Sequence, residues 1–181
     1  NTVSSYSNLL QEDFGNGGDT KSPGINAAYC WEKQDGNTNA FADCFSTPAD
    51  WHSWLLNDCG YVVTNALLPD HDPDFRWILP KDHTSVLNNT PAITDGRFLA
   101  VNIGKLIPKG AVLYSKTIND VLPNQDINVS LYMINLLKNS NALASPQLTV
   151  QLVKNGVVIG TPVDFPEIPR DEKWHSTTDL A

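Results

Sequence analysis

The chain has 181 residues, of which 41% are hydrophobic and 18% charged, and its formal net charge is −8. This length suits a single domain, and the hydrophobic fraction is enough for a packed core, which excludes wholesale disorder. An acidic chain without a cluster of Lys or Arg is repelled by phosphate groups, which excludes nucleic acids and anionic membrane surfaces as natural partners. No apolar run approaches the ~20 residues that a membrane-spanning helix needs.

Residues 16–58 form a loop-rich segment that we expect to be an insertion covering one end of the fold. This segment and the residue directly after it contain all three cysteines, Cys30, Cys44 and Cys59, and three tryptophans. We predict a Cys44–Cys59 disulfide, because it would close a short loop, while three reduced and buried thiols are the alternative. A segment so poor in regular structure needs such a covalent link, or packed tryptophans, to hold its shape.

Five short segments along the chain are predicted to be β-strands, because they are rich in β-branched residues and bounded by Gly, Pro or Asn. They are residues 61–66, 97–103, 111–118, 127–135 and 147–153. The last of them alternates clearly, with Leu148, Val150 and Leu152 on one face. The sequence KNGV that follows predicts a two-residue Asn-Gly turn, with VVIG returning as the partner strand.

No segment longer than about ten residues shows the 3.6-residue period of an amphipathic helix. Many short strands joined by turn-forming residues are typical of β-sandwiches. The sequence therefore predicts an all-β fold, a two-sheet antiparallel β-sandwich or jelly roll, formed by residues 1–181 as one domain.

The acidic stretch between the first two predicted strands could suggest a metal or catalytic site. Asp70, Asp72 and Asp74 alternate as in a calcium loop, but Phe75 stands where the EF-hand pattern requires Gly, and Lys81 where it requires Glu. A solvated acidic turn is the alternative reading. For an enzyme, the candidate residues would be these three aspartates together with His71, His83 and Arg76.

Seven segments occur in an order that resembles the extracellular jelly-roll domain common in surface proteins of Bacteroidetes. They are LLQEDFGNG (9–17), CGYVVTNA (59–66), FRWILPKDHT (75–84), DGRFLAVNIG (95–104), AVLYSKTI (111–118), INVSLYMINLL (127–137) and EKWHSTTDL (172–180). More distantly, the order resembles the MAM domain of animal receptors. Proteins with such domains are often large adhesins or gliding-associated proteins exported by the type IX secretion system.

The resemblance implies a structural Ca²⁺ ion where the N-terminal strand meets the strand after Asp-His-Thr. Glu12, Asp13 and Asp82 are the ligands that it implies, because carboxylates from distant strands repel one another unless a cation neutralises them. The alternative is that Asp13 and Asp82 only cap turns. The family's closing segment, Gly-Asn-Asp followed by Asp-Asp-Ile, has no counterpart here, so we expect the C-terminal closing strands to be missing.

These observations favour a non-catalytic module of an exported bacterial protein on the cell surface, which mediates adhesion by binding a glycan or a surface protein. For a glycan, the aromatic platform would come from Trp31, Trp51, Trp54 and Tyr61, although the tryptophans could instead be core. A structural spacer or interaction domain in a surface or secretion assembly, or contact with another domain of the same long chain, is the first alternative. A polysaccharide-active enzyme on a jelly-roll scaffold is the second.

Overall fold

The computed structural model describes residues 9–32, 56, 58–67, 77–83, 96–104, 107–124, 126–139 and 143–176. The regular elements of this part of the chain are β-strands, which confirms the predicted all-β class. They are β1 (Cys30–Trp31), β2 (Gly60–Thr64), β3 (Phe98–Val101), β4 (Tyr132–Met133), β5 (Thr149–Lys154), β6 (Val157–Asp164) and β7 (His175–Ser176). No helix in the described residues is long and apolar enough to cross a membrane.

The central sheet has the strand order β1-β2-β3, and β2 is its buried middle strand. All five residues of β2 are buried, as expected for a strand with neighbours at both edges and on both faces. The pair β2–β3 is antiparallel, as predicted, whereas the pair β1–β2 is parallel. The alternating residues of β3 divide between two environments: Phe98 and Ala100 are buried in the main core, while Leu99 and Val101 are only half-buried.

The described part of the predicted insertion consists of residues 16–32, 56 and 58, and residues 16–32 are bonded to this sheet and to Tyr114. Isolated β-bridges connect Asn16 with Gly96, Thr20 with Val63, and Ile25 with Tyr114. The Arg97 side chain adds two hydrogen bonds, donated by Nε to the carbonyl oxygens of Gly17 and Gly18 at 3.2 and 2.8 Å. Over this stretch the segment is thus held by backbone pairing. Residues 33–55 and 57 lie outside the described residues.

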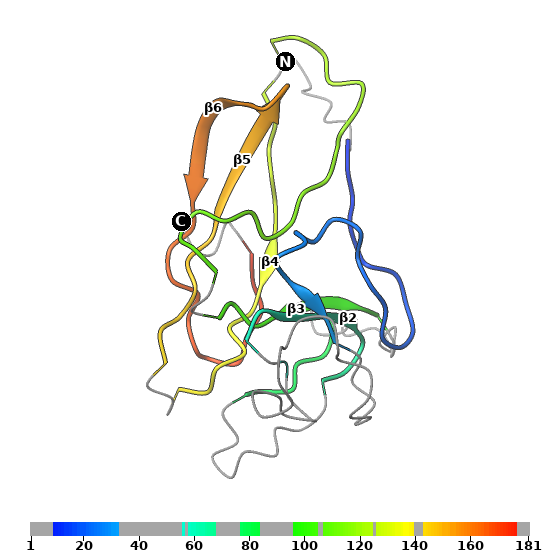
Figure 1. Ribbon diagram of the computed structural model, residues 1–181, viewed down its shortest axis with the longest axis vertical. Helices are drawn as coiled ribbons and strands as arrows, with labels where there is room; N and C mark the ends of the chain where they lie inside the picture. The colour runs from blue at the N-terminus through cyan, green and yellow to red at the C-terminus, as the bar shows by residue number, and fades with distance from the viewer. Residues whose placement is uncertain are drawn as a thin grey trace, which may run out of the picture.

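The hairpin β5–β6 confirms the clearest local prediction (Figure 1). Asn155 and Gly156 have φ angles of 52° and 79°, the left-handed values that a type I′ turn requires and that Asn-Gly supplies at low cost. In β5, Val150 and Leu152 are half-buried while Gln151 is exposed, as the alternation predicted. The pairing is irregular between Val150 and Leu152, opposite a stretch of β6 that contains Gly160.

A second, smaller core lies between this hairpin and the pair β4–β7. Its buried residues are Met133, Phe165 and Ile168, against which Leu131, Leu148 and Val150 pack. The other predicted strands are only partly regular: in 127–135 only Tyr132–Met133 pairs as a strand, and in 111–118 only Tyr114 forms a bridge. The described residues thus form sheets of three, two and two strands, and a closed two-sheet jelly roll is a finer arrangement than these sheets define.

Candidate functional site

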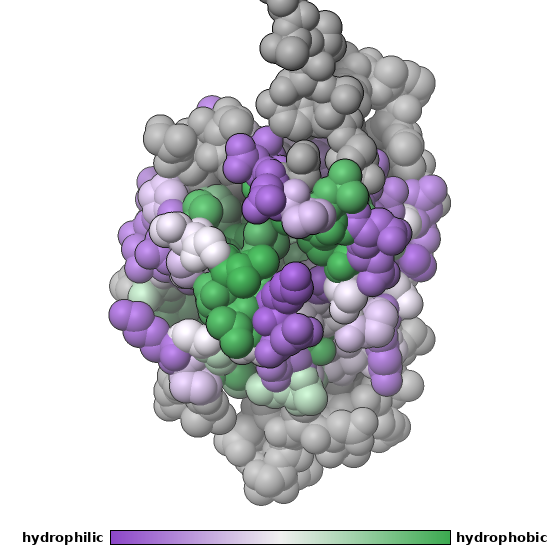
Figure 2. Space-filling model, turned by 90° about the horizontal axis from the view of Figure 1, so that it is seen from above, coloured by the Kyte–Doolittle hydropathy of each residue, from purple (hydrophilic) through white to green (hydrophobic). Residues whose placement is uncertain are grey.

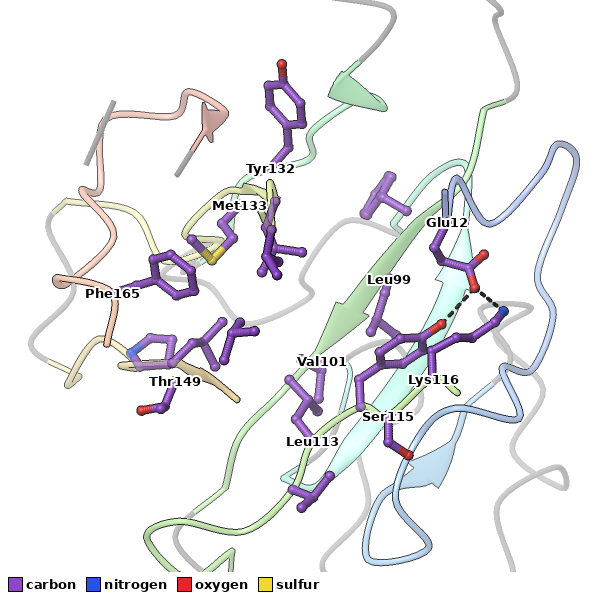
Figure 3. Close-up of a pocket in the computed structure, with 18 of the residues that line it drawn as sticks. Glu12, Leu99, Val101, Leu113, Ser115, Lys116, Tyr132, Met133, Thr149 and Phe165 are labelled. Carbon is purple, nitrogen blue, oxygen red and sulfur yellow. Dashed lines mark hydrogen bonds and ion pairs between the residues drawn. The ribbon is translucent and has the colours of Figure 1, made fainter. Parts of the chain in front are cut away.

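A wide groove separates the central sheet from the smaller core. Leu99, Val101 and Leu113 line it from one side, and Met133 and Phe165 from the other (Figure 3). Its volume is about 3560 Å³, several times the ~300–1,000 Å³ of small-molecule pockets. Figure 2 shows apolar side chains gathered around a hollow in one face of the molecule, with hydrophilic side chains around them. A groove of this size suits a protein surface better than one small ligand.

The β5–β6 hairpin, part of which lines this groove, exposes large apolar side chains. Cross-strand pairing places Val157, Ile159 and Val163 on the same face as the half-buried Val150 and Leu152. The exposed fractions of Val157, Ile159 and Val163 are 64%, 43% and 54%. All eight residues of β6 are exposed, so among the described residues no second layer covers this strand. Contiguous exposed apolar side chains of this kind usually mark an interaction surface.

Glu12, one of the predicted cation ligands, is satisfied by protein donors. Its Oε2 accepts a hydrogen bond from the Tyr114 hydroxyl at 2.7 Å and another from Lys116 Nζ at 2.6 Å (Figure 3). Its Oε1 accepts from the Phe14 backbone N–H at 3.2 Å. Burial alone would raise the pKa of Glu12, but the hydrogen bonds from Lys116, Tyr114 and Phe14 and the charge of Lys116 lower it below 4.5.

The contacts among Glu12, Tyr114 and Lys116 shift the pKa of Tyr114 in the opposite direction to that of Glu12. Burial, together with the hydrogen bond to Glu12 and its negative charge, raises the pKa of Tyr114 well above its ordinary value. The phenol therefore stays protonated and the carboxylate stays ionised, which is a structural arrangement rather than a poised acid–base pair.

Glu12, Asp13 and Asp82, the predicted calcium ligands, do not come together as a group that could hold a metal ion. Asp13 accepts a hydrogen bond from the Gly15 backbone N–H at 3.0 Å, so it caps a local turn. Asp82 is buried beside Gly96, and His83 Nδ1 lies 3.3 Å from its Oδ1. No group of three or more His, Cys, Asp or Glu side chains that could hold a metal occurs in the described residues. At Glu12 the positive charge comes from Lys116.

The cysteines pair differently from the prediction. Cys59 carries a free thiol, whereas Cys30 is disulfide-bonded, so the predicted Cys44–Cys59 disulfide is wrong. Cys59 directly precedes β2, where its backbone N–H donates to the Asn102 carbonyl at 2.9 Å and its carbonyl accepts from the Cys30 N–H at 2.9 Å. Burial and the negative charge of Asp58 raise the pKa of its thiol, which disfavours the reactive thiolate.

The aromatic platform predicted for a glycan is not gathered by the residues that the structure describes. Tyr61 is 6% exposed and belongs to the buried strand β2. Trp31 is half-buried; its indole N–H donates to the Thr20 carbonyl at 2.8 Å, and Lys21 Nζ lies 5.0 Å from its ring centre. Trp51 and Trp54 lie outside the described residues.

Of the residues named for an enzyme, Asp70, His71, Asp72, Asp74 and Arg76 lie outside the described residues. His83 is described, and its imidazole packs among aromatic rings. The Tyr132 ring lies parallel to it, with ring centres 4.2 Å apart, and the Trp174 ring is tilted against it at 5.8 Å. Trp174 in turn meets the buried Phe98 edge-on at 6.0 Å. Sequence reasoning missed this cluster, because its four rings come from four separate segments and no local pattern in these segments indicates that the rings meet.

No known family matches the chain, and no curated protein or solved structure matches it either. The assignment of function therefore depends on the geometry described above.

Proposed function

We propose that this chain is a non-catalytic interaction module of an exported bacterial cell-surface protein, and that it binds a partner protein through the β5–β6 hairpin and the adjoining groove. The observation that carries the proposal is the exposed apolar face of β6, formed by Val157, Ile159 and Val163. Full burial of an exposed side chain of this size stabilises by about 1.5–3 kcal/mol, and about half of each surface is still exposed here, so a covering partner gains about 1 kcal/mol from each.

The charge around the groove indicates the chemistry of the partner. Among the described residues, the groove is lined by seven carboxylates and three cations: Glu12, Asp13, Asp58, Asp82, Asp120, Asp126 and Asp164 against Arg97, Lys109 and Lys116. The whole chain carries a net charge of −8. Complementary potentials steer association, so the expected partner presents an apolar surface bordered by Lys and Arg.

Three further expectations from the sequence differ in their support: export, the jelly roll and the calcium ion. Export is supported by the disulfide at Cys30, because disulfides persist mainly in oxidising compartments. A two-layer jelly roll is supported by the antiparallel pairing of β2 with β3, β4 with β7 and β5 with β6. A structural Ca²⁺ ion at Glu12, Asp13 and Asp82 has no support from the donor set, since an ion there would have to displace the Lys116 ammonium.

Selection from a library of random peptides of about 12 residues, long enough to span a strand-sized site, tests the binding proposal. The hairpin variant, Val157→Ser with Ile159→Ser and Val163→Ser, removes the apolar face while leaving the Asn-Gly turn intact. We expect the enriched peptides to alternate apolar and polar residues, to carry Lys or Arg, and to bind the hairpin variant at least about tenfold more weakly.

Leu79→Ser is the matched control, because Leu79 is 51% exposed and does not line the groove. This control should bind the selected peptides as the unmodified chain does, and amide NMR spectra should show that the hairpin variant keeps its fold. Enriched peptides that bind the hairpin variant as tightly as the unmodified chain would contradict the proposal.

A further inference from the structure

A series of four aromatic rings runs from the main core to the surface. Phe98 is buried in the core, Trp174 contacts it edge-on, His83 lies against Trp174, and Tyr132 stacks on His83. Tyr132 is paired with Ser176 across β4–β7, and Trp174 lies two residues before Ser176, so both rings are in reach of His83, which contacts each of them. We call Phe98, Trp174, His83 and Tyr132 the ring series.

The outermost ring is exposed and held in place. Tyr132 is 43% exposed, while the neighbouring Met133 is buried in the smaller core, and Figure 3 shows the two side chains pointing in different directions. The stack with His83, at an interplanar angle of 20°, fixes one face of the Tyr132 ring. Trp174 is itself anchored, because its indole N–H donates to the Lys81 carbonyl at 2.8 Å. A ring ordered in advance loses little conformational entropy when a ligand covers it.

Polar groups lie at the edges of these rings. His83 Nδ1 lies 3.3 Å from Asp82 Oδ1. The other ring nitrogen of His83, Nε2, is on the opposite edge of the imidazole. The phenol hydroxyl of Tyr132 is both a donor and an acceptor, and within the described residues it forms no hydrogen bond. An apolar ring face beside such groups is complementary to a molecule with an apolar face and a hydroxyl rim.

We propose that Tyr132, His83 and Trp174 form a carbohydrate-binding subsite that takes one pyranose ring of a neutral glycan. The apolar C–H face of the sugar covers the Tyr132 ring, and its hydroxyls meet the Tyr132 hydroxyl and His83 Nε2. The three residues line the same groove, but none of them belongs to β5 or β6, so substitutions can test this subsite separately from the hairpin surface.

Two other ligand classes fit the site less well. Nucleotides also stack on aromatic rings, but their phosphates are repelled by a chain of net charge −8. Proline-rich peptides dock in grooves lined by several exposed aromatic side chains. In the ring series, Tyr132 is exposed, His83 and Trp174 are half-buried and Phe98 is buried. A single presented ring with a polar edge suits a sugar.

The test is a titration of the ¹⁵N-labelled chain with cellohexaose, laminarihexaose, xylohexaose, mannohexaose and maltohexaose, followed by amide and indole NMR signals. We expect at least one of these glycans to shift the signals of Tyr132 and Trp174. Tyr132→Ala should raise the Kd of that glycan by about tenfold, the loss expected for one aromatic contact. Tyr132→Phe, which keeps the ring, should change the Kd by less than about threefold.

Trp31→Phe is a control, because the sequence predicted Trp31 for glycan binding but Trp31 is not in the ring series. This substitution should leave the Kd of the glycan unchanged. The hairpin variant should also bind the glycan normally, so failure of the hairpin proposal and failure of this one are distinguishable. The inference is overturned if none of the five glycans shifts the signals, if Tyr132→Ala binds as tightly as the unmodified chain, or if a proline-rich peptide shifts them and the glycans do not.

Discussion

Replacing Glu12 with Gln tests whether the Glu12–Tyr114–Lys116 cluster holds the N-terminal segment to the rest of the fold. The substitution keeps the shape of the side chain and removes its charge. The contact with Tyr114 weakens from a charge-assisted to a neutral hydrogen bond, a loss of about 1 kcal/mol. Lys116 is 42% exposed, so its ion pair adds no more than about 1 kcal/mol. The free energy of unfolding should therefore fall by about 1–2 kcal/mol.

For a chain of this length, such a loss corresponds to a fall in Tm of about 2–8 °C at pH 7. The pH dependence has a defined sign. The pKa of Glu12 is lower in the folded chain than its ordinary 4.5, so the folded state binds the proton more weakly than the unfolded state. The stabilisation is complete above pH 4.5 and is lost as the pH falls through the folded-state pKa. The two proteins should then unfold alike.

Thermal unfolding followed by circular dichroism between pH 3 and pH 7 measures this difference. Glu167→Gln is the matched control, because Glu167 is exposed and forms no hydrogen bond or ion pair within the described residues. The control should melt as the unmodified chain does at each pH. The reasoning is refuted if Glu12→Gln leaves the Tm unchanged at pH 7, or if the difference persists in acid.

Three further predictions concern Gly24, Cys59 and Lys116. In Gly24→Ala the new Cβ would overlap the Tyr114 ring, so urea unfolding should show a loss of about 1–3 kcal/mol in the free energy of unfolding. Gly18→Ala is the control and should show little change, because no atom lies within 4 Å of its new Cβ. Iodoacetamide should modify the free Cys59 thiol without prior reduction. At pH 8 the reaction should be slower than that of an unperturbed thiol, because the pKa of Cys59 is raised and less thiolate is present. Detection of Cys59 in a disulfide by mass spectrometry would contradict the structure. If calcium binds at Glu12, Lys116→Met should enlarge the calcium-dependent rise in Tm, and no rise in either protein would contradict the ion.

The features predicted correctly from sequence are those that local chemistry determines. The β5–β6 hairpin follows from Asn155 and Gly156, whose φ angles suit the turn, and from the alternation of the residues before them. The strand β2 follows from its run of β-branched residues. By contrast, residues 111–118 have similar propensities but form only one bridge, at Tyr114, because a strand also needs a partner, and its own sequence does not supply one.

The candidate sites depended on long-range contacts and were harder to predict. The preference for a short disulfide loop placed Cys59 with Cys44, but the backbone of Cys59 is bonded to Asn102 and Cys30, and its thiol is free. Likewise, the glycan platform was expected among tryptophans that are close in sequence. The ring series instead joins side chains from four segments, of which the pairing between β4 and β7 brings only two together, those of Tyr132 and Trp174.

The irregular pairing of β6 has a consequence for self-assembly. Its outer edge includes Gly160, with a φ of 69°, and Pro162, which has no N–H to donate. A second identical strand cannot add to this edge in a continuous ladder, because the bulge and the proline interrupt the row of donors and acceptors. An exposed apolar hairpin whose edge strand had an uninterrupted row of backbone donors and acceptors would be prone to form amyloid-like fibrils. The interruption in β6 lowers this risk while leaving its broad apolar face open to other molecules.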